Sequence, residues 1–271
     1  MTAVARESGA VLARTRRTRG IVAAWVAPLL TFVALLGVWH LATIVFDWPV
    51  WLVPTPVDVG EALWDYRSLL PRQFWITLLE TVAGFALAVA VGIPLAVAIA
   101  VSSLLERTIY PLLLALNAVP KIAIAPILIL WMGFGYGPKI VVAFLLCVFP
   151  IVISTASGLA STSAELVELA RSLCASRRQT FLKIRFPAAM PQVFVGLKVA
   201  ISLAVIGAVI GEFVGSSEGL GWVIVNSGAN VNTPLAFAAM ALLAVMSVVL
   251  FYVLVALERW LVPWAQHDEN A

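Results

Sequence analysis

Charged residues are scarce in this sequence: Asp, Glu, Lys and Arg make up 11% of it, against about 25% in soluble domains. Histidine occurs twice and cysteine twice, so the usual side chains of metal centres and catalytic triads are few. Cys147 and Cys174 allow one bridge at most and lack metal-ligand spacing. Of the 271 residues, 62% are hydrophobic, and the mean hydropathy is +1.04. This composition excludes a cytosolic enzyme and predicts a chain that lies in a lipid bilayer.

Six apolar stretches are long enough to cross about 30 Å of hydrocarbon as helices. They cover approximately residues 22–46, 74–101, 110–132, 140–160, 193–214 and 235–257. A closed barrel would need alternating apolar and polar residues, which are missing, so the stretches are expected to be helical. The third is the least regular because Pro111, Pro120, Lys121 and Pro126 interrupt it. The sequence therefore predicts an all-α membrane protein with six transmembrane helices.

The distribution of Lys and Arg predicts the orientation of these helices. If the N-terminus is cytoplasmic, 12 Lys and Arg residues fall inside and 3 outside, Lys139 among the latter. Cytoplasmic loops carry such an excess, so both termini are expected in the cytoplasm. The transmembrane region then covers residues 22–264, between tails at 1–21 and 265–271. The Arg-rich start resembles a signal peptide, but the first apolar stretch is longer than a signal h-region and is expected to remain as a span.

The predicted inside loop of residues 161–191 is the most polar part of the chain after its termini. Apolar residues recur with helical spacing on one face of its first part, at Leu166, Leu169, Ala170 and Leu173. A second amphipathic stretch covers residues 177–186 and is expected to end at Pro187. The loop is therefore predicted to be a helix, a turn and a helix. Such a loop could lie on anionic headgroups or bind a partner.

The residue spacing in this loop favours the partner. In order, the loop contains Glu168-Leu169-Ala170, three residues, Cys174, nine residues, Ile184, one residue and Phe186-Pro187. This spacing resembles the E-A-A, x3, G, x9, I-x-L-P signature of permease subunits of ATP-binding-cassette (ABC) importers. The sequence departs from it at Leu169, Cys174 and Phe186. A glycine at position 174 would permit a left-handed turn that a cysteine adopts only with strain.

Further segments resemble the nitrate, sulfonate, taurine and thiamine-precursor branch of this family. They are Val53-Pro54-Thr55-Pro56, residues 119–123 with 128–135, and residues 211–215 with 219–221. The resemblance implies a type I importer fold in the plasma (inner) membrane. It also implies a second permease subunit, expected to be identical, two cytoplasmic ATPase subunits and an extracytoplasmic solute-binding protein. The solute is expected to be a small anion, such as a sulfonate, nitrate or bicarbonate, or a pyrimidine-type vitamin precursor.

The chain itself is expected to be a non-catalytic transport subunit. It has no G-x-x-x-x-G-K-[ST] motif to cradle ATP, so ATP and Mg²⁺ would be used by the partner ATPase and no cofactor by this chain. A secondary transporter would usually show internal repeats, and an intramembrane enzyme would need catalytic groups at depth; both stay as alternatives. The basic residues lie at the ends of apolar stretches, which argues against nucleic acid as a partner.

Three groups of functional residues follow from the motif and the resemblance. The predicted ATPase-coupling residues are Glu165, Glu168, Leu169, Ala170, Arg171, Leu173, Cys174, Ala175, Ser176, Ile184 and Pro187. The predicted pathway or gate residues are Pro120, Lys121 and Pro150. The predicted contacts to the binding protein are Pro54, Asp58, Glu218, Gly219 and Gly221.

Three charged residues carry alternative predictions, and one pair of glycines carries a packing prediction. Lys121 either meets an anionic solute or lies near the cytoplasmic face, where its ammonium reaches the headgroups. Glu80 and Glu212 are near the outer ends of their spans and are expected at the interface, or in contact with the binding protein. The spacing Gly207-x-x-x-Gly211 is expected to allow close helix packing.

Overall fold

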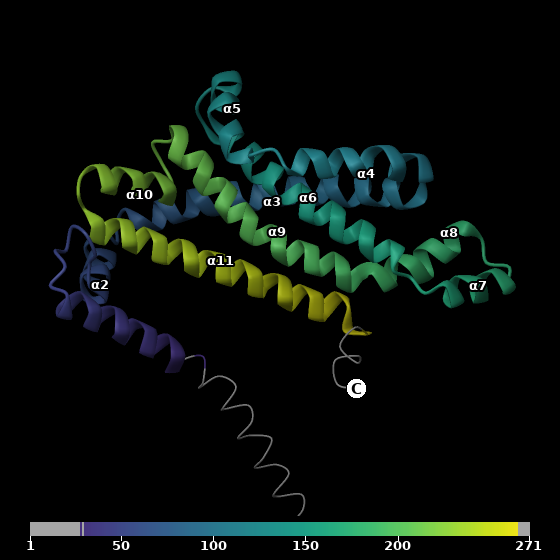
Figure 1. Cartoon of the computed structure of the whole chain (residues 1–271), viewed down its shortest axis with the longest axis horizontal. Helices are drawn as coiled ribbons and strands as arrows, with labels where there is room; N and C mark the ends of the chain where they lie inside the picture. Colours follow the sequence, from purple (N-terminus) through teal and green to yellow (C-terminus); the bar gives the residue numbers. More distant parts are fainter. Residues whose placement is uncertain (1–27, 29, 265–271) are drawn as a thin grey trace, which may run out of the picture.

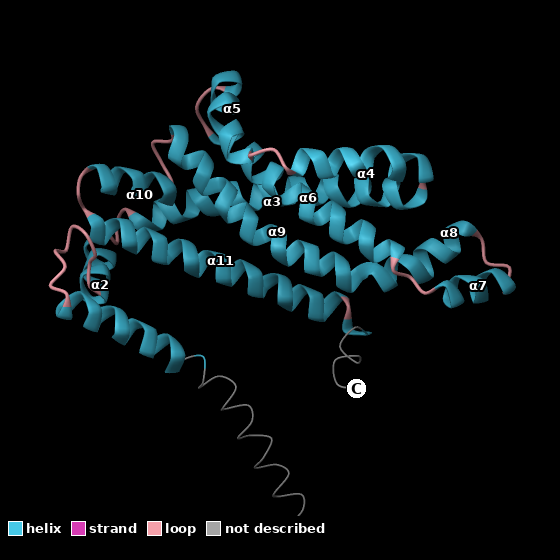
Figure 2. Cartoon of the chain, in the orientation of Figure 1, coloured by secondary structure: helices cyan, strands magenta, loops and turns pink. Residues whose placement is uncertain are grey.

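The computed structural model describes residue 28 and residues 30–264, and these form helices and loops without strands (Figure 2). Four helices are long and apolar enough to cross a membrane: α3 (Leu70–Val101), α6 (Tyr136–Ala160), α9 (Phe186–Gly215) and α11 (Thr233–Leu261). They run lengthwise beside one another (Figure 1). They contain the second, fourth, fifth and sixth predicted spans. The predicted all-α membrane fold is thus confirmed.

The two remaining apolar stretches form shorter pieces. The third is divided into α4 (Ser103–Asn117), a 3₁₀ turn (Lys121–Ile124) and α5 (Ala125–Met132), with a bend of 81° between the two parts. Pro120 lies at the break with an extended ψ of 93°, and its missing N–H and its ring prevent α4 from continuing through it. The first stretch contains the apolar helix Leu30–Val45; the earlier part of that predicted span lies outside the described residues.

Short helices lie at the two ends of the long ones (Figure 1). At one end are α7 (Ala164–Ser172) and α8 (Arg177–Thr180), which we call the α7–α8 end. At the other are α2 (Pro56–Asp65) and α10 (Leu220–Ala229), which we call the α2–α10 end. The loops predicted for the two sides of the membrane therefore gather at opposite ends of the molecule.

The closest packing in the core joins α6 to α9. A Cβ atom on Gly207 would lie 2.6 Å from Ala143 Cα, and one on Gly211 would lie 2.8 Å from Lys139 Cα. No side chain fits at these distances, so the glycines let the two backbones approach each other. The predicted packing role of the Gly207-x-x-x-Gly211 spacing is confirmed.

The sequence predicted that the second helix of the inside loop ends at Pro187, but it continues beyond this residue. α8 continues through a π-helical turn, Phe181–Arg185, into α9, so that Arg177–Gly215 forms one apolar helix of 39 residues. In the π turn the Phe186 N–H donates to the Phe181 carbonyl, five residues back. This wider turn directly precedes Pro187 and accommodates its missing N–H and its ring. The prediction failed because a proline can occupy the first turn of a helix.

Candidate functional site

The turn after α7 has the left-handed geometry for which the importer signature has a glycine, although this chain has Cys174 at that position. The Ala175 N–H donates to the Ala170 carbonyl (3.0 Å), and the Cys174 N–H donates to the Arg171 carbonyl (2.9 Å). These two bonds form a Schellman motif, in which the residue after the C-cap is left-handed and usually glycine. Cys174 is that residue, with φ of +57°. The turn thus keeps its left-handed shape with a cysteine, at a cost of about 1 kcal/mol.

Replacing Cys174 by glycine is expected to stabilise this turn. Cys174→Gly removes the strained Cβ and should stabilise the turn against local unfolding by about 1 kcal/mol. Hydrogen exchange of the α7 amides should therefore slow about fivefold. Cys174→Ala is the matched control, because alanine keeps the Cβ and brings no gain. Equal protection of α7 in the two variants would show that Cys174 is not strained.

α7 lies at the far end of the molecule from α2 and α10 (Figure 1). An exposed apolar stripe follows one face of this helix. Its members are Leu166, Leu169 and Leu173, whose exposed fractions are 47%, 56% and 74%. Glu165 and Glu168 are also exposed. The stripe recurs at helical spacing, which is the pattern of a helix that binds in a groove of another protein. We call it the Leu face.

Four other predicted coupling residues have structural positions in this segment. Ala170 is only 4% exposed. Ser176 forms a capping box with Gln179: its Oγ accepts from the Gln179 N–H (3.2 Å), and its own N–H donates to Gln179 Oε1 (2.8 Å). Ile184 lies in the π turn and Pro187 in the first turn of α9. The sequence pattern alone did not separate these structural positions, and a coupling role for these residues stays a prediction.

Lys121 lies at the break between α4 and α5. Its Nζ donates to the Asn117 carbonyl (3.1 Å) and to Asn117 Oδ1 (2.7 Å), which places a cation at the C-terminus of α4. The same atom is 4.5 Å from the ring centroid of Phe149, in the middle of α6. Lys121 is therefore held at mid-height of the helices, rather than near the end of a span. Pro150 lies next to Phe149, within α6.

Three charged side chains are buried near the α2–α10 end. Glu80 on α3, Lys139 on α6 and Glu212 on α9 are 0%, 5% and 1% exposed, and Lys139 Nζ donates to Glu80 Oε1 at 2.6 Å. The predictions that the two glutamates lie at the interface and that Lys139 lies in an outside loop are wrong. α6 begins at Tyr136, so Lys139 is in its first turn, packed on Gly211.

The Glu212 carboxylate closes the N-terminus of α10. It accepts from the Gly221 N–H (2.5 Å) and from Thr77 Oγ1 (2.7 Å), and Thr77 Oγ1 in turn accepts from the Leu220 N–H (2.8 Å). Gln73 Oε1 accepts from the Gly219 N–H (2.6 Å). A carboxylate is favourable beside the free N–H groups of a helix start. The turn between α9 and α10 is thus fixed to α3.

The residues predicted to contact a binding protein are divided between surface and interior. Gly219 and Gly221 are buried, and a Cβ on Gly219 would overlap the Glu212 carboxylate, so these glycines hold the turn closed instead of facing outward. Pro54 is buried as well. Asp58 forms the capping box of α2, accepting from the Thr55 N–H at 2.7 Å. Glu218 is partly exposed and pairs with Arg72.

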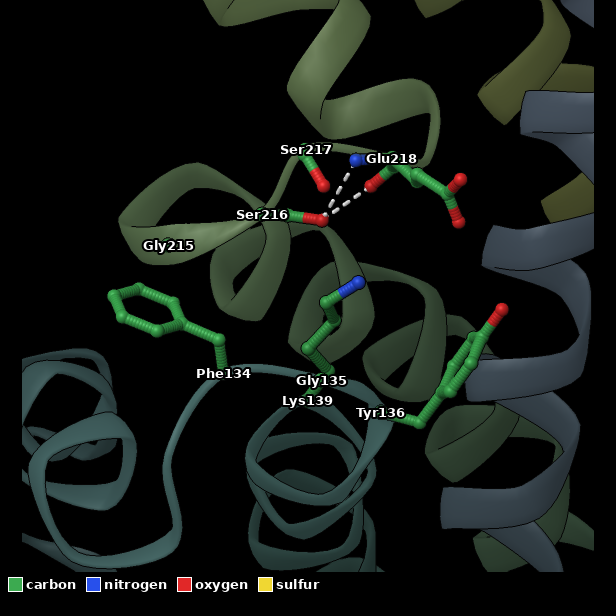
Figure 3. Close-up of a pocket in the computed structure, with 8 residues that line it drawn as sticks. All are labelled: Phe134, Gly135, Tyr136, Lys139, Gly215, Ser216, Ser217 and Glu218. Carbon is green, nitrogen blue, oxygen red and sulfur yellow. Dashed lines mark hydrogen bonds between the residues drawn. The ribbon is translucent and has the colours of Figure 1, made fainter.

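A pocket of ≈420 Å³ opens beside this turn (Figure 3). Phe134, Tyr136 and Lys139 line it from one side, and the loop of residues 215–218 from the other. Ser216 Oγ hydrogen-bonds to the backbone of Glu218 within that loop (Figure 3). Lys139, whose ammonium pairs with Glu80, therefore forms part of the pocket wall.

Sequence reasoning missed the buried charges as a cluster. Isolated charges in or beside apolar stretches were the available signal, because an ionisable residue inside a membrane protein needs a partner. Which charge pairs with which depends on helix packing: Lys139 and Glu80 are 59 residues apart, and Thr77 and Glu212 are 135 apart.

Together, the membrane-length helices and the short helices at their ends define a multi-pass membrane protein with an exposed apolar face on α7. Residues 88–267 match the family described as the binding-protein-dependent transport system inner membrane component. The chain belongs to this family, in agreement with the resemblance carried by the loop signature.

Relatives and a solved structure agree with this assignment. The chain is 36% identical over 225 residues to a probable ABC transporter permease protein of Haemophilus influenzae, covering 83% of this chain and 92% of that protein. It is 34% identical over 238 residues to the formylaminopyrimidine transport permease protein of Halalkalibacterium halodurans, covering 88% and 95%. An inward-facing structure of the MetNI methionine ABC transporter has the same fold, with a TM-score of 0.62 and 22% identity over 73% of this chain and 97% of that one.

The protein is therefore a multi-pass inner-membrane permease subunit of an ABC importer, with the type I fold. It is a transport subunit and not an enzyme. The predictions of family, of an all-α type I importer fold and of membrane location are confirmed, whereas the cytoplasmic orientation of the termini stays a prediction.

Proposed function

We propose that the Leu face binds a groove of the importer's ATPase subunits. The observation that carries this proposal is the exposure of Leu166, Leu169 and Leu173 on one face of a helix that protrudes from the bundle. Burying three leucines supplies the free energy of attachment. Glu165 and Glu168 would make polar contacts at the edge of the groove.

The same segment is built to carry movement into the membrane. α8, the π turn and α9 form the continuous helix Arg177–Gly215, and α9 packs along α6. ATP-driven closure of two ATPase subunits would push α7, and this helix would transmit the push as a rigid lever. ATP and Mg²⁺ would be bound by the ATPase subunits only. The α7–α8 end would then face the cytoplasm, which its arginines and lysines support.

Affinity purification of the tagged chain from its own membranes tests this proposal. An ATPase subunit should co-purify, together with a second permease subunit, which we propose to be a copy of this chain. Both proteins can be identified by intact mass. Recovery of the chain without any ATPase subunit, under conditions that retain the second permease, would contradict docking at α7.

At the opposite end, we propose that the α2–α10 surface receives the solute-binding protein. The pocket of ≈420 Å³ opens there, and the Arg72–Glu218 pair lies beside it with both side chains partly exposed. Because Glu212 and Gln73 fix the turn below, this surface is rigid enough for docking.

We propose that Lys121 and Pro120 lie beside the solute pathway. Lys121 is partly exposed at mid-height of the bundle, where Asn117 and the Phe149 ring hold its ammonium. An ionisable residue at this depth commonly marks a solute or ion pathway. Three relatives are named as permease proteins for formylaminopyrimidine, taurine and nitrate. These names support the two solute classes predicted from the sequence, a small anion and a pyrimidine-type vitamin precursor.

Neutralising Lys121 is expected to slow uptake of an anionic solute. Lys121→Gln removes the charge and should weaken the interaction of the anion with the pathway by about 1.4 kcal/mol. Uptake of labelled taurine or nitrate into vesicles containing the assembled importer should therefore fall about tenfold. Lys121→Arg keeps the charge and is the control. Uptake in Lys121→Gln equal to that in Lys121→Arg, at equal membrane insertion, would remove Lys121 from the pathway.

A further inference from the structure

Three arginines converge on a pocket at the α7–α8 end. The pocket has a volume of ≈430 Å³ and lies between the end of α3 and the segment that contains α7 and α8. Arg171, Arg177 and Arg185 line it, and no carboxylate of the described residues does. Ala100 and Val101, the last residues of α3, form its apolar side. The lining therefore combines charge of one sign with the end of a membrane-length helix.

These arginines have no side-chain partner in the part of the chain that the structure describes. The three ion pairs there involve other residues, and Arg185 Nε is buried without a hydrogen-bond acceptor. Arg185 also borders an adjoining pocket of ≈390 Å³, where Glu106 lies, but it forms no ion pair with Glu106. A buried guanidinium N–H without an acceptor costs free energy, so the site is suited to an external anion.

We propose that this pocket binds a phosphate group, and that an anionic phospholipid headgroup supplies it. Guanidinium groups match phosphate oxygens with paired hydrogen bonds, and three unpaired ones exceed the charge of a single phosphodiester. Val101 is 70% exposed beside the pocket and offers a surface for acyl chains. A basic pocket at the cytoplasmic end of membrane helices is where such headgroups bind.

The lipid would hold α7 without competing with the Leu face. Val167 and Arg171 both line the pocket, four residues apart on one side of α7, whereas Leu166, Leu169 and Leu173 follow another side. A headgroup bound to Arg171 on α7, Arg177 on α8 and Arg185 in the π turn would join all three to the end of α3. Lipid composition would then influence the position of the segment independently of ATPase docking.

Lipid binding to the purified full-length chain tests the proposal. Native mass spectrometry would count phosphatidylglycerol bound per chain during titration, with phosphatidylcholine as the zwitterionic reference. Arg171→Gln with Arg185→Gln should weaken phosphatidylglycerol binding at least tenfold. Arg178→Gln with Lys183→Gln removes the same charge from exposed positions of the α8 and π-turn segment that do not line the pocket, and should change phosphatidylglycerol binding less than twofold.

A second titration with inorganic phosphate separates the two sources of the phosphate group. If only phosphatidylglycerol binding is lost in the pocket variant, the lipid is the ligand. If the unmodified chain binds inorganic phosphate, and the pocket variant loses this binding but still binds phosphatidylglycerol, the phosphate site stands and its lipid source is overturned. Equal binding in pocket and control variants, in both titrations, would overturn the site itself. Retained α-helical circular dichroism in every variant excludes misfolding as the cause.

Discussion

Leu169→Asp should abolish solute-stimulated ATPase activity of the assembled importer while leaving this chain folded in the membrane. Leu169 is the central residue of the Leu face and is 56% exposed, so its substitution removes little packing within the chain. In the complex, the carboxylate would have to enter an apolar groove. Loss of a central apolar contact costs about 2 kcal/mol or more, so ATPase binding should weaken at least about thirtyfold.

The effect is measured as ATPase turnover in reconstituted vesicles and as ATPase subunit recovered with the tagged chain. Ser172→Asp is the charge-matched control, because Ser172 is an exposed residue of α7 outside the Leu face. Leu169→Met, which keeps an apolar side chain, should be almost silent. Full stimulation in Leu169→Asp would mean that the Leu face is not the docking surface. Ala170→Asp is a poorer test because Ala170 is buried and its substitution disturbs the fold.

The second large effect is expected from Lys139→Met, which should destabilise the bundle. Glu80 is fully buried, and Lys139 donates to one of its carboxylate oxygens; the other, Oε2, has no hydrogen-bond partner among the described residues. Removing the ammonium leaves a carboxylate buried without compensation, which costs about 3–5 kcal/mol. The midpoint of thermal unfolding in detergent, followed by tryptophan fluorescence, should fall by on the order of 10 °C.

Two variants identify the origin of this loss. Lys139→Met with Glu80→Gln removes both charges and should recover most of the midpoint, because a neutral amide is far less costly to bury. Lys198→Met makes the same change in a pair with Glu258 whose side chains are each 21% exposed, and should lower the midpoint by only a few degrees. Similar losses in Lys139→Met and Lys198→Met would show that burial of the Glu80–Lys139 pair is unimportant.

Features that depend on local sequence were predicted well. The motif spacing located the turn at Cys174, because a Schellman motif is formed by residues within one turn of each other. The prolines located the break at Pro120 for the same reason, since a missing N–H acts on the neighbouring turn. The continuation of α8 into α9 was not predicted, because a proline is compatible both with a helix end and with a first turn.

The sequence by itself determined that this chain is a helical membrane protein, where its apolar stretches lie and which loop carries the importer signature. Apolar length and local spacing are one-dimensional properties, so they can be read without knowing how helices pack. Only the tertiary structure decided that Glu80, Lys139 and Glu212 are buried, and that Arg171 faces a pocket rather than the Leu face. These placements arise from contacts between distant segments, such as Lys139 against Gly211, for which the pattern around each residue contains no information.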